Sequence, residues 1–85
     1  MMNKEEMVEE LKLFVQDRLE TAEMFANTGH EVRNIQNIAF GAVRFAYTIG
    51  ILSYEEMFDY WDNYVLDKFN HIAQNAGKGP KVEII

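Results

Sequence analysis

The chain has 85 residues, no cysteine and a formal net charge of −6, which arises from 14 acidic and 8 basic side chains. Its length predicts one domain with a modest core, and the lack of cysteine excludes disulfides and thiolate metal sites. The acidic balance argues against direct binding to DNA, because phosphates attract a basic surface.

Two segments bear on the location of the protein. The N-terminal segment 1–12 is acidic where a secretory signal would be basic and apolar. The most apolar run, residues 38–52, is shorter than a bilayer span and includes Arg44. We therefore expect a cytoplasmic protein without a membrane helix, in keeping with the absence of the disulfides that small secreted domains usually need.

Helix starts are marked by three capping-box patterns, in which a polar side chain and a glutamate three residues later satisfy backbone amides. The three pairs are Asn3 with Glu6, Thr28 with Glu31, and Ser53 with Glu56. Glycines near the expected ends, where a left-handed residue closes a helix, are Gly29, Gly50 and Gly77. We predict helices at about 4–27, 31–50 and 54–76, forming an all-α, antiparallel (up-down-up) three-helix domain over residues 1–76.

The first predicted helix has an apolar stripe on one face and charges on the other. The stripe residues are Val8, Leu11, Val15, Leu19, Ala22 and Ala26, and it is widened on one side by Met7, Phe14 and Phe25. Leu13 and Met24 fall among the charges instead. Two apolar residues on a solvated face indicate a further contact, so we assign both to a partner interface.

The middle predicted helix is apolar on two sides. One seam contains Ile35, Ile38, Ala39, Ala42, Phe45, Ala46 and Ile49. At about 100° per residue, a second band contains Arg33, Asn37, Phe40, Arg44 and Tyr47. A helix that is apolar on both sides must be covered on both sides, and two neighbours in a three-helix unit rarely enclose it. We therefore expect a symmetric homo-oligomer.

The third predicted helix is the most clearly amphipathic. Its apolar stripe, which indicates a core face, comprises Tyr54, Phe58, Trp61, Val65, Phe69, Ile72 and Ala76. Tyr60 and Leu66 lie off this stripe and join Leu13 and Met24 as predicted interface residues. Residues 77–85 predict a flexible or strand-like tail, because a Gly-Lys-Gly-Pro run precedes the alternating segment 82–84.

Residues that could carry catalysis or hold a metal ion are scattered along the chain. His30 and His71 belong to no recognised helical ligand pair, and Asp67 with His71 supplies only two ligands. No nucleophile has a partner base, and no phosphate-binding loop is present. The turn at residues 47–56 resembles a helix-turn-helix elbow, but acidic residues open the helix that would meet DNA. We therefore expect no enzyme activity, no metal and no cofactor.

The sequence leaves two functions open. The favoured one is a small non-catalytic interaction protein that binds proteins as a homo-oligomer, with the size and acidity typical of phage or mobile-element proteins. The alternative is an oligomer that sequesters a small anionic, nucleotide-like ligand. In that case Arg33 and Arg44 bind the anion, Asn37 reads a polar edge, and Phe40 and Tyr47 stack on a planar ring. In a purely structural interpretation, both arginines pair with neighbouring carboxylates.

Overall fold

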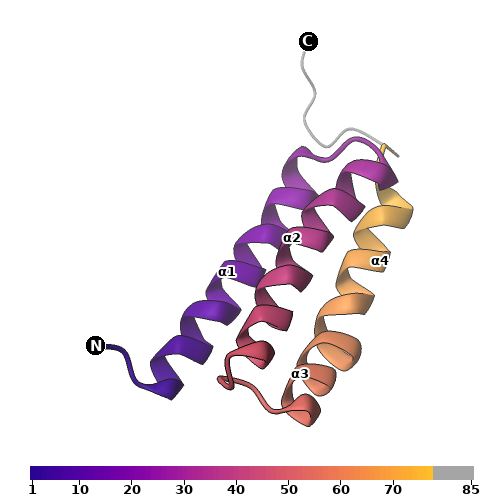
Figure 1. Ribbon diagram of the computed structural model, residues 1–85. Coiled ribbons are helices and arrows are strands. Elements are labelled where there is room, and N and C mark those ends of the chain that lie inside the picture. The colour runs from indigo at the N-terminus through magenta and orange to yellow at the C-terminus, as the bar shows by residue number, and fades with distance from the viewer. Residues whose placement is uncertain (78–85) are drawn as a thin grey trace.

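The computed structural model describes residues 1–77 as an all-helical unit of three rods (Figure 1). The first rod is α1 (Lys4–Phe25) and the second is α2 (Gly29–Thr48). The third consists of α3 (Tyr54–Tyr60), a π-helical turn η1 (Trp61–Val65) and α4 (Leu66–Asn75). The described residues contain no strand, and the segment 82–84 that was predicted as strand-like lies outside them.

The helix starts are where the capping pattern predicts them. The Asn3 side chain accepts a hydrogen bond from the Glu6 amide at 2.9 Å, and the Glu6 carboxylate accepts from the Asn3 amide at 3.2 Å. The same reciprocal pair opens α3. At α2 the box is incomplete, because Thr28 accepts from the Glu31 amide while the Glu31 carboxylate accepts from the Asn27 amide. All three caps therefore satisfy amides that a helix start leaves unpaired.

Two of the three predicted closing glycines have the expected left-handed backbone. Gly50 has φ 83° and Gly77 has φ 76°. The prediction for Gly29 is wrong, because α1 ends through the extended residue Ala26 and Gly29 is the first residue of α2. At Gly77 an added Cβ would lie 2.6 Å from the Asn27 carbonyl oxygen. The end of the third rod and the connection after α1 therefore meet backbone to backbone.

The core lies where the three rods meet. In Figure 1, α2 lies between α1 and α4, and α2 contacts both. The predicted stripe of α1 is confirmed: its central residues are buried, and its first two residues pack against them. The buried core residues are Val15, Leu19, Ala22, Ala26, Val32, Ala39, Val43, Ala46, Leu52, Trp61, Val65, Phe69 and Ile72. No helix in residues 1–77 is long and apolar enough to cross a membrane.

The buried line of the middle helix lies between the two apolar sides that the sequence predicts. Within the predicted seam, Ile38, Phe45 and Ile49 are exposed, whereas Val32 and Val43 are buried together with two of the alanines. Because α2 has neighbours on two sides, its buried line falls between the two stripes that the sequence pattern separates. The predicted seam is therefore only partly covered by the described residues: three of its seven members are exposed, two are buried, and Ile35 packs against the core.

The third rod contains a π turn that the sequence pattern does not predict. At this turn the Leu66 amide donates to the carbonyl of Trp61, five residues earlier. One extra residue in a helix rotates the preceding segment by about 100° relative to the following one.

This rotation changes which residues of the third rod meet the core. Beyond the π turn the predicted stripe holds, with Phe69 buried. Before it, Tyr54 and Phe58 are exposed, and the prediction that they belong to the core is wrong. Met57 and Tyr60 pack against the core in their place.

Candidate functional site

One end of the predicted ligand stripe on α2 already has polar partners. The Arg33 guanidinium donates to the Asn70 side chain of α4 at 2.8 Å and to the Gln36 side chain of its own helix. Asn37 is exposed beside it. Arg33 therefore ties α2 to α4 through neutral groups rather than through a carboxylate.

The rest of this stripe is divided between the core and the surface. Phe40 is half-buried, and its ring packs against Trp61 at a centroid distance of 5.0 Å, which leaves less of it for stacking on a ligand. Tyr47 is exposed and meets Tyr54 edge-on at 6.0 Å. The exposed Arg44 side chain forms no hydrogen bond or ion pair with the described residues. The five residues therefore share a side of α2, but the Phe40 ring already packs against Trp61 of the third rod.

The predicted partner-interface residues are only partly brought together. Leu13 and Tyr60 line one hollow between α1 and the third rod. Met24 is exposed elsewhere on α1, and Leu66 is half-buried and packs against the core. The structure therefore joins two of the four predicted residues.

A cluster of exposed apolar side chains lies along the seam between α1 and α2, and we call it the α1–α2 face. Its members and their exposed fractions are Phe14 (40%), Phe25 (66%), Ile38 (54%), Phe45 (62%) and Ile49 (52%). In the sequence, Ile38, Phe45 and Ile49 belong to the predicted seam of the middle helix, and Phe14 and Phe25 widen the apolar stripe of the first. The periodic signal identified their helix faces, but it could not show that those faces remain open.

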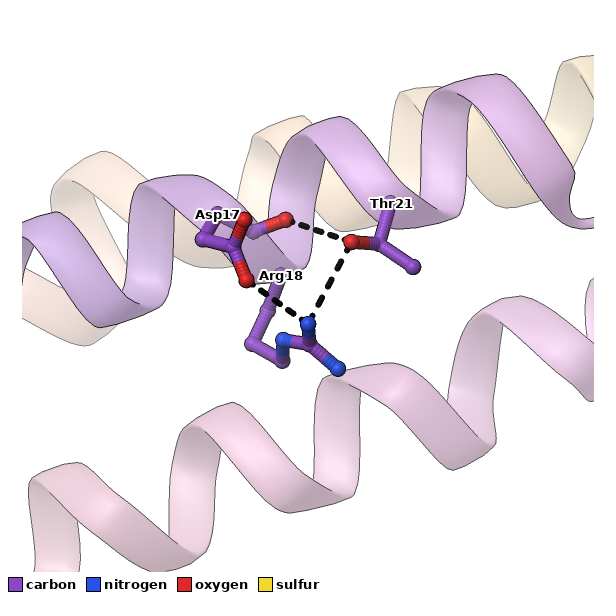
Figure 2. Close-up of polar contacts among 3 residues, drawn as sticks. All are labelled: Asp17, Arg18 and Thr21. Atoms are coloured by element: carbon purple, nitrogen blue, oxygen red, sulfur yellow. Dashed lines mark hydrogen bonds and ion pairs between the residues drawn. The ribbon is translucent and has the colours of Figure 1, made fainter.

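The position of the α1–α2 face follows from contacts on either helix. On α2, Phe40 packs against the third rod. Phe45 lies about 140° around the helix from it, on the side toward α1. On α1, the Arg18 guanidinium extends toward α2 (Figure 2) and lies 5.7 Å from the centroid of the Phe14 ring. The exposed side chains of both helices therefore border the same seam.

Arg18 extends into this seam from α1, and its charge is paired within α1 itself. Its guanidinium donates to Asp17 at 2.7 Å and to the Thr21 hydroxyl at 3.4 Å, as Figure 2 shows. Its Nε is buried without a hydrogen-bond partner in the described residues. The charge of Arg18 beside the α1–α2 face is therefore paired.

On its other side, α1 borders a groove that we call the α1–α4 groove. Three hollows of about 380, 460 and 360 Å³ follow one another along it. The first two share Lys12 and Tyr60, and the last two share Gln16. One wall is α1 from Val8 to Glu23, and the other is the third rod with Leu52 before it.

Two tyrosines of the third rod line this groove. The rings of Tyr60 and Tyr64 stack at 5.9 Å, Lys12 Nζ lies 5.5 Å from the Tyr60 ring centroid, and Lys68 Nζ lies 4.3 Å from that of Tyr64. Burial, followed by the neighbouring Tyr64, raises the pKa of Tyr60 to about 12. Tyr60 therefore stays neutral at the groove wall under physiological conditions.

The groups that could support metal or acid–base chemistry remain apart. The described residues contain no group of three or more His, Asp or Glu side chains placed to hold a metal ion. His71 lies beside Asn75, whose amide contacts its ring at 3.4 Å. Hydrogen bonds from the Ser53 amide and hydroxyl hold the pKa of Glu56 below its usual value, which reflects its role in the cap.

Comparison with protein-family models, curated proteins and solved structures finds no match. The function is therefore inferred from the surfaces of the chain itself, above all from the two sides of α1.

Proposed function

We propose that this chain is a small non-catalytic interaction protein that acts as a symmetric homo-oligomer. In this proposal the three helices alternate in an up-down-up order, and copies meet through the α1–α2 face. The observation that carries the proposal is this face itself, with five large apolar side chains on adjoining helices, each at least 40% exposed.

The extent of the α1–α2 face supports a protein contact. At about 200 Å² for a fully exposed large side chain, its five residues expose roughly 500 Å² of apolar surface. That is near the upper end for the largest patch of an ordinary monomer. A stable interface buries about 800 Å² on each partner, so the face and its rim supply much of what one contact needs.

Charge favours a second copy as the occupant of this face. The chain carries a net charge of −6, so two copies repel each other wherever their acidic surfaces meet. On the α1–α2 face the charge of Arg18 is paired with Asp17. Apolar surface offers two acidic copies a contact with less repulsion than their acidic surfaces do, and a two-fold contact would use the same face on both.

Gly41 gives independent support for a contact between copies at this side of α2. It lies in the middle of α2, close to Ile38 and Phe45 around the helix, and a Cβ added to it would meet nothing within 4 Å. Its φ is not positive, so neither packing nor backbone conformation within this chain requires glycine there. An internal helix glycine is destabilising by about 1 kcal/mol relative to alanine. Close approach of a helix from another copy would explain its presence.

Sedimentation velocity over a range of concentrations tests this proposal. Wild-type protein should assemble as its concentration rises, and Phe45→Ser should weaken assembly by about tenfold or more, because it removes an exposed anchor. Phe58→Ser is the matched control, since Phe58 is also exposed but lies on α3 outside the face. A wild-type monomer at every concentration, or equal weakening by both variants, would overturn the proposal.

A second candidate function is sequestration of a small nucleotide-like anion by the oligomer. It is favoured by Arg44, which is exposed and has no side-chain partner among the described residues although acidic groups are abundant. Native mass spectrometry of gently purified protein would then show an oligomer that carries a reproducible extra mass. Arg44→Ala should remove that mass and leave the fold intact. Unchanged function in a folded Arg33→Ala/Arg44→Ala variant would exclude sequestration.

A further inference from the structure

We infer that the α1–α4 groove binds a basic amphipathic helix of a partner protein. This surface is separate from the α1–α2 face, and binding here does not depend on self-association. Its length, its apolar walls and its charge each point to that class of partner.

The groove has the dimensions of a helix-binding site. Its α1 wall runs from Val8 to Glu23, which at about 1.5 Å per residue is roughly 22 Å, or four helical turns. Neighbouring hollows share lining residues along this length, so the three adjoin one another in a row. Grooves of this kind receive the apolar face of an amphipathic helix.

Apolar side chains occur along the whole groove. Leu11 and Leu52 line one end, Leu13 and Tyr60 line the middle, and Ile72 lines the other end. Leu13 is largely exposed, so a partner could cover it without any rearrangement of the core. These positions would receive side chains that recur every three or four residues on a partner helix.

The rim of the groove is acidic. Six carboxylates line it against two lysines, and they are those of Glu9, Glu20, Glu23, Glu56, Asp59 and Asp67. Glu9, Glu23 and Asp67 form no side-chain hydrogen bond or ion pair within the described residues. Glu23 of α1 and Asp67 of α4 line the same hollow, together with Lys68. Basic side chains of a partner would relieve the repulsion among these carboxylates.

The two lysines do not turn the groove into an anion site. Both ammonium groups lie over tyrosine rings, Lys12 over Tyr60 and Lys68 over Tyr64. The surrounding carboxylates would repel a nucleic acid or an acidic peptide. A second copy of this acidic chain is disfavoured for the same reason.

The π turn helps to shape this groove. It rotates the first part of the third rod so that Tyr60 turns inward against the core, where it stacks with Tyr64 on the groove wall. Single π turns occur frequently at functional sites. Here the turn gives the groove two rigid aromatic side chains of the type that dominates protein interfaces.

A pair of synthetic peptides tests the inference by fluorescence anisotropy. The first is a labelled helix of about 16 residues with leucines along one face and lysines beside them, and the second has glutamate in place of every lysine. The basic peptide should bind saturably and at least about tenfold more tightly than the acidic one, with affinity that falls as salt rises. No saturable binding of the basic peptide, or equal binding of both, would overturn the inference.

Matched charge reversals locate the binding site. Glu20→Lys/Glu23→Lys changes the rim, whereas Glu10→Lys/Asp62→Lys makes the same change in net charge at exposed positions that do not line the three hollows. Circular dichroism would confirm that both variants fold. The rim variant should weaken peptide binding by about tenfold and the control by much less. Equal weakening would show general attraction to an acidic protein and contradict the groove.

An apolar variant and a competition experiment complete the test. Leu13→Ser should also weaken peptide binding, and because Leu13 is exposed this change should leave the fold intact. Peptide binding should be unaffected by Phe45→Ser, which acts on the other face. Binding that competes with self-association would assign the groove to a second copy and overturn the inference.

Discussion

The two sides of α1 differ in the partners that they fit. Toward α2, it borders the apolar α1–α2 face, beside which Arg18 is paired with Asp17. Toward the third rod, it borders a groove whose apolar walls are rimmed by carboxylates, three of them without a side-chain partner in the described residues. A mainly apolar face suits a like copy of an acidic chain, whereas an acidic rim suits an unlike, basic partner.

This difference shows how a small domain can serve two contacts from one helix. Successive side chains of a helix point about 100° apart, so one segment can present an apolar face and an acidic groove wall. Because a symmetric contact repeats every charge, it favours surfaces with few unpaired charges. A contact between different proteins can use complementary charges instead.

The largest expected effect is a loss of stability that distinguishes a core residue from a residue of the α1–α2 face. Phe69 is fully buried, so Phe69→Ala should lower the free energy of unfolding by about 3–5 kcal/mol at every protein concentration. Phe45→Ala should change the stability of the dilute monomer little, because Phe45 is exposed. Urea unfolding at several concentrations measures both. If Phe45→Ala were as damaging as Phe69→Ala in dilute solution, the placement of Phe45 on an open face would be wrong.

Loss of an aromatic wall residue should affect the groove more than the face. Tyr64 lines the groove and is half-exposed, so Tyr64→Ala should leave the fold intact while removing one of the two stacked rings. Binding of the basic peptide should fall by about tenfold, the scale on which an interface aromatic matters. Sedimentation should show unchanged self-association. Loss of both activities together would mean that the two surfaces are not independent.

Gly41→Ala should have opposite effects on the monomer and on the oligomer. In the dilute monomer it should raise the free energy of unfolding by up to about 1 kcal/mol, because alanine is the better helix former and its Cβ meets open space. In the oligomer the same Cβ should obstruct the approaching helix and weaken assembly. Sedimentation and urea unfolding of one variant give both values. Stronger assembly would argue against close helix approach at Gly41.

The smallest effect concerns Tyr60 at alkaline pH. Burial raises the pKa of Tyr60 to about 12, above its usual value of 10.0, so the folded state binds this proton more tightly than the unfolded state does. The resulting stability is present below the ordinary tyrosine pKa and is lost as pH rises through the folded value. Absorbance titration should show a tyrosine that titrates near 12 in wild type and is missing in Tyr60→Phe. Ordinary titration of all four tyrosines would contradict the half-buried position of Tyr60.

Local signals predicted much of this fold. The caps at Asn3 and Ser53 and the closing residues Gly50 and Gly77 act within one turn of helix, so they can be recognised without knowledge of neighbouring helices. The stripe of α1 was predicted correctly because it is the widest apolar face of a helix whose other faces carry charges.

The candidate surfaces were harder to predict. The periodicity of α2 shows two apolar sides, but it does not show that the neighbouring helices bury the line between them and leave parts of both sides exposed. The four predicted interface residues contained two members of the groove, Leu13 and Tyr60, because both break an otherwise regular pattern. The acidic rim could not be predicted, since it gathers carboxylates from two rods that are distant in sequence.

By itself, the sequence determined that this protein is helical, where its helices begin, and which face of α1 enters the core. Those features depend on hydrogen bonds and side-chain spacing within a few residues. Only the tertiary structure decided the buried line of α2, the π turn at Trp61–Val65 and the two surfaces of α1. These depend on how three rods pack around shared side chains such as Trp61 and Phe40, and a single helix pattern does not contain that information.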